Sequence, residues 1–207
     1  MIGKSPPAEE ILRRGSEDLI LASRSARRKM LLEMLGVSFR IVPPPEDPPA
    51  AERVSDPERY AVTQALQKCR AVALNQPEDS PVVILGADTI VILGEDVLEK
   101  PKDEDEAFRY LKQLAGREHT VITGLALHRR GDGREVTGYE ASRVRMAALD
   151  DGTIRRYIRT GEPMDKAGAY GIQGIGALII EAVSGCYFNV VGLPLARLRR
   201  LFEELET

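Results

Sequence analysis

Hydrophobic and polar positions follow two different periodicities along this chain, one of which predicts helices and the other strands. Apolar residues at helical spacing, preceded by capping residues, predict helices over 26–35, 55–74, 104–115 and 151–159, and from Pro194 onward. Aliphatic and β-branched runs typical of strands cover residues 20–23, 38–42, 82–93, 97–99, 119–130, 134–146 and 177–183. Because the two kinds of element are mixed without strict alternation, we expect an α/β fold with a central mixed β-sheet flanked by helices.

Local signals refine the ends of these elements. Ser25 is the expected cap of the first helix, and Ser55 with Glu58 resembles a capping box at the start of the second. Prolines exclude regular structure from residues 43–55, and glycines predict a loop over 167–176. We expect residues 1–17 to be a loosely ordered extension and residues 18–207 to form a single domain.

Composition narrows the class of protein. The 207 residues are 43% hydrophobic and 29% charged, with a net charge of −3, so no overall basic field favours a nucleic acid or a membrane. Cys69 and Cys186 match no zinc spacing, and we expect both to be reduced in a cytoplasmic protein. His119 and His128 are expected to be structural. No apolar run is long enough to span a bilayer, and the first residues lack the apolar core of a signal peptide.

Asp88 is the most informative residue of the sequence. Only Asp88 and Thr89 interrupt the aliphatic run of residues 82–93. A carboxylate in apolar surroundings costs several kcal/mol unless a cation or hydrogen-bond donors meet it. If residues 94–96 are a hairpin turn, the returning strand brings Lys100 beside Asp88, where the pair could hold a divalent metal, activate water and contact a phosphate. The alternatives are a surface bend at the strand end and a purely structural ion pair.

Two further segments carry candidate ligands for phosphate or metal. In SRSARRK (23–29), Arg27 and Arg28 lie in the first turn of a helix, where they oppose the helix dipole but suit phosphate oxygens. In PPPEDPP (43–49), Glu46 and Asp47 could present carboxylates to Mg²⁺. A solvated basic helix start and a solvated acidic loop are the respective alternatives.

The glycine-rich segment DKAGAYGIQGIG (165–176) could approach a flat ligand closely, or be only a mobile connection. Its Gln173 could read the edge of a base, because an amide both donates and accepts hydrogen bonds. Neither a dinucleotide-binding GxGxxG after a strand nor a P-loop occurs. Together with the basic and acidic segments, this pattern favours a nucleotide hydrolase.

Four ordered segments resemble the Maf family of nucleoside triphosphate pyrophosphatases. They are LILASRSARRKMLLEMLGVSF, ILGADTIVIL, EKPKDEDEAFRYLKQLAG and GEPMDKAGAYGIQGIGALIIEAVSGCYFNVVGLPL, and they span nearly the whole chain after residue 18. The resemblance implies a Maf/ITPase-like fold with two lobes and a cleft, often dimeric. It also implies a cytoplasmic house-cleaning enzyme that needs Mg²⁺ or Mn²⁺ and cuts its substrate between the α- and β-phosphates.

The resemblance also implies roles for individual residues. Asp88 of GADT would be the catalytic acid that deprotonates water, and would bind the metal together with Asp47 and Glu46. Gln173 in AGAYGIQG is typical of the branch that acts on dTTP and UTP. The remaining residues would contact phosphates, hold the triphosphate or tune substrate choice, namely Lys68, Lys100, Ser23, Arg27, Arg28 and Thr89.

Some positions depart from the family pattern. Ala26 replaces a proline of the first motif, Glu99 stands where a glycine often precedes the lysine of the KP motif, and the acidic pair at Glu46 and Asp47 is displaced among prolines. The alternatives are hydrolysis of 7-methyl-GTP or other non-canonical purine triphosphates, and a nucleotide-binding regulator of septum formation.

Overall fold

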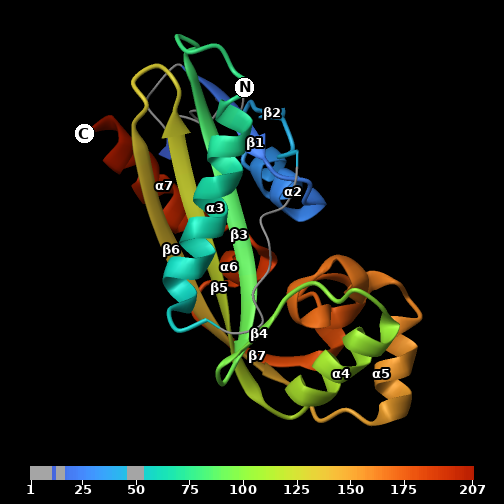
Figure 1. Ribbon diagram of the computed structural model, residues 1–207. Helices are drawn as coiled ribbons and strands as arrows, with labels where there is room; N and C mark the ends of the chain where they lie inside the picture. Colours follow the sequence, from blue (N-terminus) through green and yellow to red (C-terminus); the bar gives the residue numbers. More distant parts are fainter. Residues whose placement is uncertain (1–10, 13–16, 46–53) are drawn as a thin grey trace, which may run out of the picture.

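The computed structural model describes residues 11–12, 17–45 and 54–207, and its centre is one seven-stranded mixed sheet (Figure 1). The strand order is β2-β1-β3-β5-β6-β7, with β4 paired to β3. The strands are β1 (Asp18–Ala22), β2 (Arg40–Ile41), β3 (Val82–Leu93), β4 (Asp96–Leu98), β5 (Glu118–Arg129), β6 (Glu135–Met146) and β7 (Ile180–Ser184). Strand β1 runs parallel to β2 and β3, and every other pairing is antiparallel, which confirms the predicted mixed sheet.

Helices cover both faces of this sheet, as predicted. The α-helices are α2 (Ala26–Met34), α3 (Pro57–Ala73), α4 (Glu104–Leu114), α5 (Asp151–Ile158), α6 (Tyr187–Val191) and α7 (Leu195–Glu206), and the 3₁₀ helices are η1 (Glu162–Asp165), η2 (Ala167–Ala169) and η3 (Gly174–Ile179). Among the described residues, no helix combines the length and the apolar character needed to cross a membrane.

The alternation of side chains along β1 and β3 separates two hydrophobic layers. Ile20 and Ile84 point to one face and pack against α3, while Leu21 and Leu85 point to the other and pack against α2 and α7. Leu12, within the segment expected to be a loose extension, is buried in the second layer. Both faces are apolar because helices exclude water from both.

The structure has two lobes. The first contains α2, α3 and α7, and the second contains α4 and α5 and has its own core at the other end of β3, β5 and β6. Helices α4 and α5 lie side by side there, away from α3 and α7 (Figure 1). Their apolar residues pack with Val91, Val121 and Val144 from the three long strands. The two lobes therefore share one continuous sheet, and the three long strands connect them.

Four local predictions differ from the structure. The second helix is capped by Asp56, whose side chain accepts a hydrogen bond from the Arg59 backbone, so Ser55 is not its cap. The predicted strand 38–42 is regular only at Arg40–Ile41. The apolar run 177–183 begins as the 3₁₀ helix η3 and joins the sheet only from Ile180. The loop predicted over 167–176 includes the 3₁₀ helix η2 and the first three residues of η3.

Glycines let α3 lie unusually close to the sheet. A Cβ on Gly86 would meet the Ala65 carbonyl oxygen at 2.3 Å, and a Cβ on Gly124 would meet the Ala61 carbonyl oxygen at 2.2 Å. Gly124 is the register partner of Asp88 on β5. The lack of side chains at these positions therefore fixes how near α3 comes to Asp88.

Gly124→Ala should destabilise the protein by at least ~2 kcal/mol, because its methyl group overlaps the α3 backbone and the helix must move. Gly131→Ala is the matched control: its Cβ would find its nearest neighbour at 3.9 Å, and the free energy of unfolding should change by less than about 0.5 kcal/mol. Urea denaturation measures both. Equal stability of the two variants would contradict the close-packing argument.

Candidate active site

A cavity of about 380 Å³ opens on an unpaired stretch of the β3 edge. On this edge β3 pairs with β1 up to Gly86 and with β4 from Val91. In the part of the chain that is described, residues 87–90 have no strand partner there. Asp88 and Thr89 lie in this gap and line the cavity, together with residues of α2, α3 and the glycine-rich segment. The cavity therefore lies between the two lobes.

Asp88 forms a tight ion pair with Lys68 of α3. Lys68 Nζ lies 2.7 Å from Asp88 Oδ1, and the two side chains are only 9% and 15% exposed. Such a pair is sensitive to loss of either partner, since the remaining charge would be buried alone. A cation thus meets Asp88, as expected, and that cation is Lys68. Lys100, expected at this place, lines the same cavity.

Glu99 adds a second carboxylate to this cavity. The Tyr60 hydroxyl donates a hydrogen bond to Glu99 Oε1 at 3.3 Å. Burial and the neighbouring Asp88 carboxylate raise the pKa of Glu99 to about 7, although Tyr60, Lys68 and Lys100 act in the opposite direction. Two acids and two lysines therefore share one partly dry space, as in sites that bind or transform charged ligands.

Arg28 ties the loop after β1 (residues 23–25) to Thr89 on β3 and to the Gly192 carbonyl. Its Nε donates to the Gly192 carbonyl at 2.8 Å, and its two terminal nitrogens donate to Ser23 Oγ at 3.2 Å and Thr89 Oγ1 at 3.0 Å. Thr89 Oγ1 also lies 2.9 Å from Thr123 Oγ1. This buried network fixes the loop after β1, so Arg28 orients Ser23 and Thr89 within the cavity wall.

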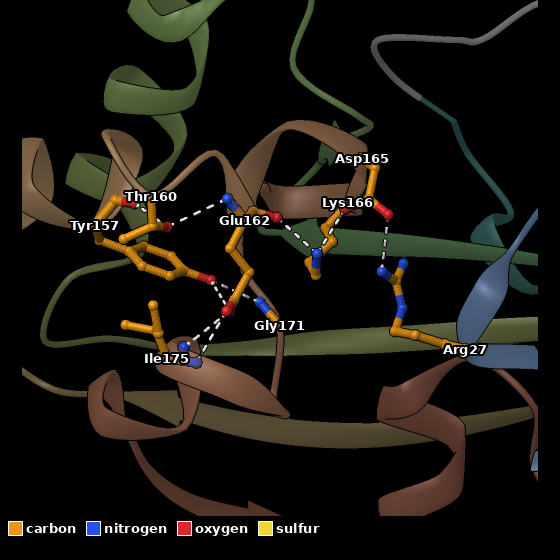
Figure 2. Close-up of polar contacts among 9 residues, drawn as sticks. Arg27, Tyr157, Thr160, Glu162, Asp165, Lys166, Gly171 and Ile175 are labelled. Atoms are coloured by element: carbon orange, nitrogen blue, oxygen red, sulfur yellow. Dashed lines mark hydrogen bonds and ion pairs between the residues drawn. The ribbon is translucent and has the colours of Figure 1, made fainter. Parts of the chain in front are cut away.

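Arg27 reaches across the cavity to the other lobe (Figure 2). Its NH1 group lies 3.1 Å from Asp165 Oδ2, and Lys166 Nζ lies 2.5 Å from the other oxygen of the same carboxylate. Arg27 and Lys166 therefore form a cationic pair around one acid, and all three residues line the cavity.

Glu162 fixes the backbone of the glycine-rich segment. Its carboxylate accepts hydrogen bonds from the Tyr157 hydroxyl and from the backbone of Ile175 and Gly176 (Figure 2). Gln173, at the cavity wall, lies within the segment that these bonds hold. Sequence reasoning missed Glu162 and Tyr60. The only signal for Glu162 was an acid a few residues before a glycine-rich stretch.

The cavity brings together most of the predicted site residues. Glu46 and Asp47, the predicted metal ligands of the proline-rich loop, lie outside the described residues. The predicted residues that line the cavity are Ser23, Arg27, Arg28, Lys68, Asp88, Thr89, Lys100 and Gln173.

Neither histidine lines the cavity, consistent with structural roles. His119 Nε2 is 2.7 Å from the Tyr170 hydroxyl, and burial lowers the pKa of His119 to about 4. His128 Nδ1 is 3.0 Å from Glu135 Oε1 at the opposite end of β5.

Comparison with known proteins places this arrangement in a family. A relative from Thermoanaerobacter sp. (strain X514), named dTTP/UTP pyrophosphatase, is 46% identical over 180 residues, which are 87% of this chain and 92% of the relative. Relatives of the same name from Koribacter versatilis (strain Ellin345) and Dictyoglomus turgidum (strain DSM 6724 / Z-1310) are 48% and 43% identical, covering 88% and 89% of this chain and 92% and 94% of theirs.

The fold also has a solved counterpart. The structure of a HAM1 protein from Coxiella burnetii matches 91% of this chain and 99% of its own, with a TM-score of 0.51 and 15% sequence identity, which shows likeness of fold alone. The family model described as Maf-like protein matches residues 18–205. With a cavity lined by the residues of all four motifs, the chain belongs to the Maf-like protein family.

Proposed function

We propose that this protein is a nucleoside triphosphate pyrophosphatase that hydrolyses dTTP and UTP to the monophosphate and pyrophosphate. The observation that carries the proposal is the Lys68–Asp88 pair, which faces a cavity that is also lined by Arg27, Lys100 and Lys166. Relatives between 43% and 48% identical bear the name of this activity. A carboxylate among several cations suits hydrolysis of a polyanion better than simple binding.

The cations of the cavity supply the charge that a triphosphate needs. Arg27 approaches from α2, Lys68 from α3 and Lys166 from the glycine-rich segment, so positive groups surround the ligand from three directions. Fixed positive groups stabilise the charge that develops on phosphoryl oxygens during transfer. Arg27 and Lys166 would exchange Asp165 for phosphate oxygens when the substrate enters.

Asp88 is the proton acceptor in this proposal. A water oxygen forms a bond to the α-phosphorus, the bond from that phosphorus to the oxygen bridging the α- and β-phosphates breaks, and pyrophosphate leaves with the electron pair. The proton lost by the water passes to the Asp88 carboxylate. Lys68 keeps Asp88 in place through the 2.7 Å contact, and Arg28 keeps Thr89 in place beside it.

The acids of the cavity fit a divalent cation, Mg²⁺ or Mn²⁺. Mg²⁺ is held in such enzymes by one or two carboxylates together with phosphate oxygens of the substrate. Asp88 and Glu99 face the same cavity, and within the described ranges no group of three potential ligands occurs. Asp88 would therefore hold the ion with the triphosphate, and Glu46 or Asp47 would complete its ligands. The ion would supply positive charge and a more acidic water.

Gln173 is the residue proposed to recognise the base. Thymine and uracil present an N–H donor between two carbonyl acceptors, and a glutamine amide can match one donor and one acceptor.

Both cysteines of the chain are free thiols, which suits the reducing cytoplasm where we place this activity.

Asp88→Asn should lower the turnover of dTTP and UTP by at least ~100-fold, because an amide cannot accept the proton. Because the buried Lys68 ammonium would lose its counter-charge, the melting temperature should also fall, so turnover is measured well below it. Pyrophosphate release with Mg²⁺ measures turnover, and the exposed Asp79→Asn is the matched control. Unaltered turnover in the Asp88 variant would refute the assigned role.

Gln173→Glu should reduce the preference for dTTP and UTP over 7-methyl-GTP by roughly 10-fold or more, because a carboxylate cannot donate to a pyrimidine carbonyl. The ratio of kcat/KM values across a panel of triphosphates measures this preference. Gln113→Glu makes the same charge change at an exposed position of α4. Identical ratios in wild type and Gln173→Glu would exclude base recognition by Gln173.

Glu99→Gln should change how stability depends on pH. The pKa of Glu99 rises from 4.5 in the unfolded chain to about 7 in the folded protein. The neutral carboxyl is favoured by folding, so its contribution is complete below about pH 4.5 and is lost as the pH rises through about 7. Urea denaturation without divalent metal, at several pH values, should show wild type losing stability relative to Glu99→Gln over this window. Parallel pH curves would contradict the raised pKa.

A further inference from the structure

One carboxylate, that of Glu162, holds both ends of the turn formed by residues 171–176. Its Oε1 accepts from the Tyr157 hydroxyl at 2.8 Å and from Gly176 N at 2.9 Å, while its Oε2 accepts from Ile175 N at 2.9 Å. The Tyr157 hydroxyl in turn accepts from Gly171 N at 3.1 Å. Gly171 and Gly176 are therefore tied to the same Glu162–Tyr157 pair (Figure 2).

The turn closes around this carboxylate without spare space. A Cβ on Gly174 would lie 2.6 Å from Glu162 Oε2, and Gly174 has a φ of +70° that disfavours other residues. A Cβ on Gly176 would lie 2.2 Å from the Gly171 carbonyl oxygen and 2.5 Å from the Tyr157 hydroxyl. The glycines thus let the backbone wrap the carboxylate, and the carboxylate satisfies the amides of the wrapped backbone.

The charge of Glu162 is retained in this setting. Burial on its own raises the pKa of Glu162, but the hydrogen bonds from Gly176, Ile175 and Tyr157 outweigh burial and lower the pKa below its ordinary value. An ionised carboxylate makes stronger hydrogen bonds than a neutral group, so the turn is held firmly at neutral pH.

Gln173 lies at the middle of the turn and lines the cavity, whereas Glu162 does not line it. An influence of Glu162 on a bound base therefore passes through the turn, in which Gly171, Ile172 and Gln173 line the cavity. Amide recognition depends on direction and distance, and a displacement of about 1 Å in a positioning element can cost on the order of 100-fold in rate.

We propose that Glu162 is the positioning residue for base selection: its carboxylate fixes the turn that presents Gln173, and so sets the preference for thymine and uracil over other bases. This inference rests on the proposed function of Gln173 and extends it to a residue that does not contact the nucleotide. Tyr157 belongs to the same device, because its hydroxyl links Glu162 to Gly171.

Glu162→Gln tests the carboxylate with little change of shape. A glutamine side chain has one oxygen and one NH₂ group in place of the two carboxylate oxygens. Its NH₂ group must therefore face either the Ile175 amide or the Gly176 amide and the Tyr157 hydroxyl. In either orientation an N–H donor points at another donor and a hydrogen bond is lost. Tyr157→Phe keeps the carboxylate and removes the hydroxyl, and with it one hydrogen bond to Glu162 and the link to Gly171. Glu181→Gln is the control, an exposed glutamate of the same lobe on β7.

The experiment measures kcat and KM for dTTP, UTP, dCTP and dGTP with Mg²⁺ in these variants, in Gln173→Ala, and in the Glu162→Gln, Gln173→Ala double variant. We expect the preference for dTTP and UTP to fall about 10-fold in Glu162→Gln and less in Tyr157→Phe, with kcat on the disfavoured substrates unchanged. The double variant should lose no more preference than Gln173→Ala, because both changes act through one group.

The outcomes separate the inference from the proposed function. An equal loss on all four substrates, an additive double variant, or a preference that survives Glu162→Gln but not Gln173→Ala would overturn the positioning role. A wild-type enzyme without preference for dTTP and UTP would overturn the proposed function itself. If Glu162→Gln fails to fold, judged by its melting curve, Tyr157→Phe decides, and unchanged preference in that variant counts against the inference.

Discussion

The site depends on one buried ion pair, the contact between Lys68 on α3 and Asp88 on β3. A carboxylate and an ammonium group this far from water stabilise the fold only when they meet at hydrogen-bond distance, and here they lie 2.7 Å apart. That distance requires α3 to approach the sheet closely, which Gly86 and Gly124 permit by having no side chain. The helix packing and the chemistry of Asp88 are therefore consequences of the same constraint.

The interruption in the sheet explains why the acid is buried and yet accessible. Strand β1 leaves the edge of β3 after Gly86, and β4 joins that edge only at Val91. Asp88 and Thr89 lie in the interval, so their side chains, which point to opposite faces of β3, both border one cavity. Ligand sites at places where neighbouring strands diverge are typical of α/β sheets. Here the divergence also separates the two lobes.

Much of the cavity could be predicted from the sequence, because a polar residue in an aliphatic run or a cluster of glycines has few structural explanations. Asp88 and Gln173 carried such signals, Arg27 was marked by its positive charge at a helix start, and all three line the cavity. Lys68 emerged only from the family resemblance, since a lysine in an amphipathic helix is ordinarily solvated and nothing local shows the strand beneath it. Residues 177–179 were assigned to a strand because a short apolar run has no period that separates a strand from a 3₁₀ helix. Glu162 was missed because its partners are two backbone amides and the Tyr157 hydroxyl, and no sequence pattern reveals such contacts.

The ion pairs in the cavity would link binding of the triphosphate to binding of the proposed divalent cation. Arg27 and Lys166 share Asp165, so a triphosphate that reaches these two cations replaces a carboxylate that already pairs with them. The gain on binding is then a difference between two sets of ion pairs, and it is smaller than the charges alone suggest. A divalent cation changes this balance, because it attracts the acids and the phosphates together. On this argument the acids of the cavity would make binding of the nucleotide depend on the divalent cation that we propose for its hydrolysis.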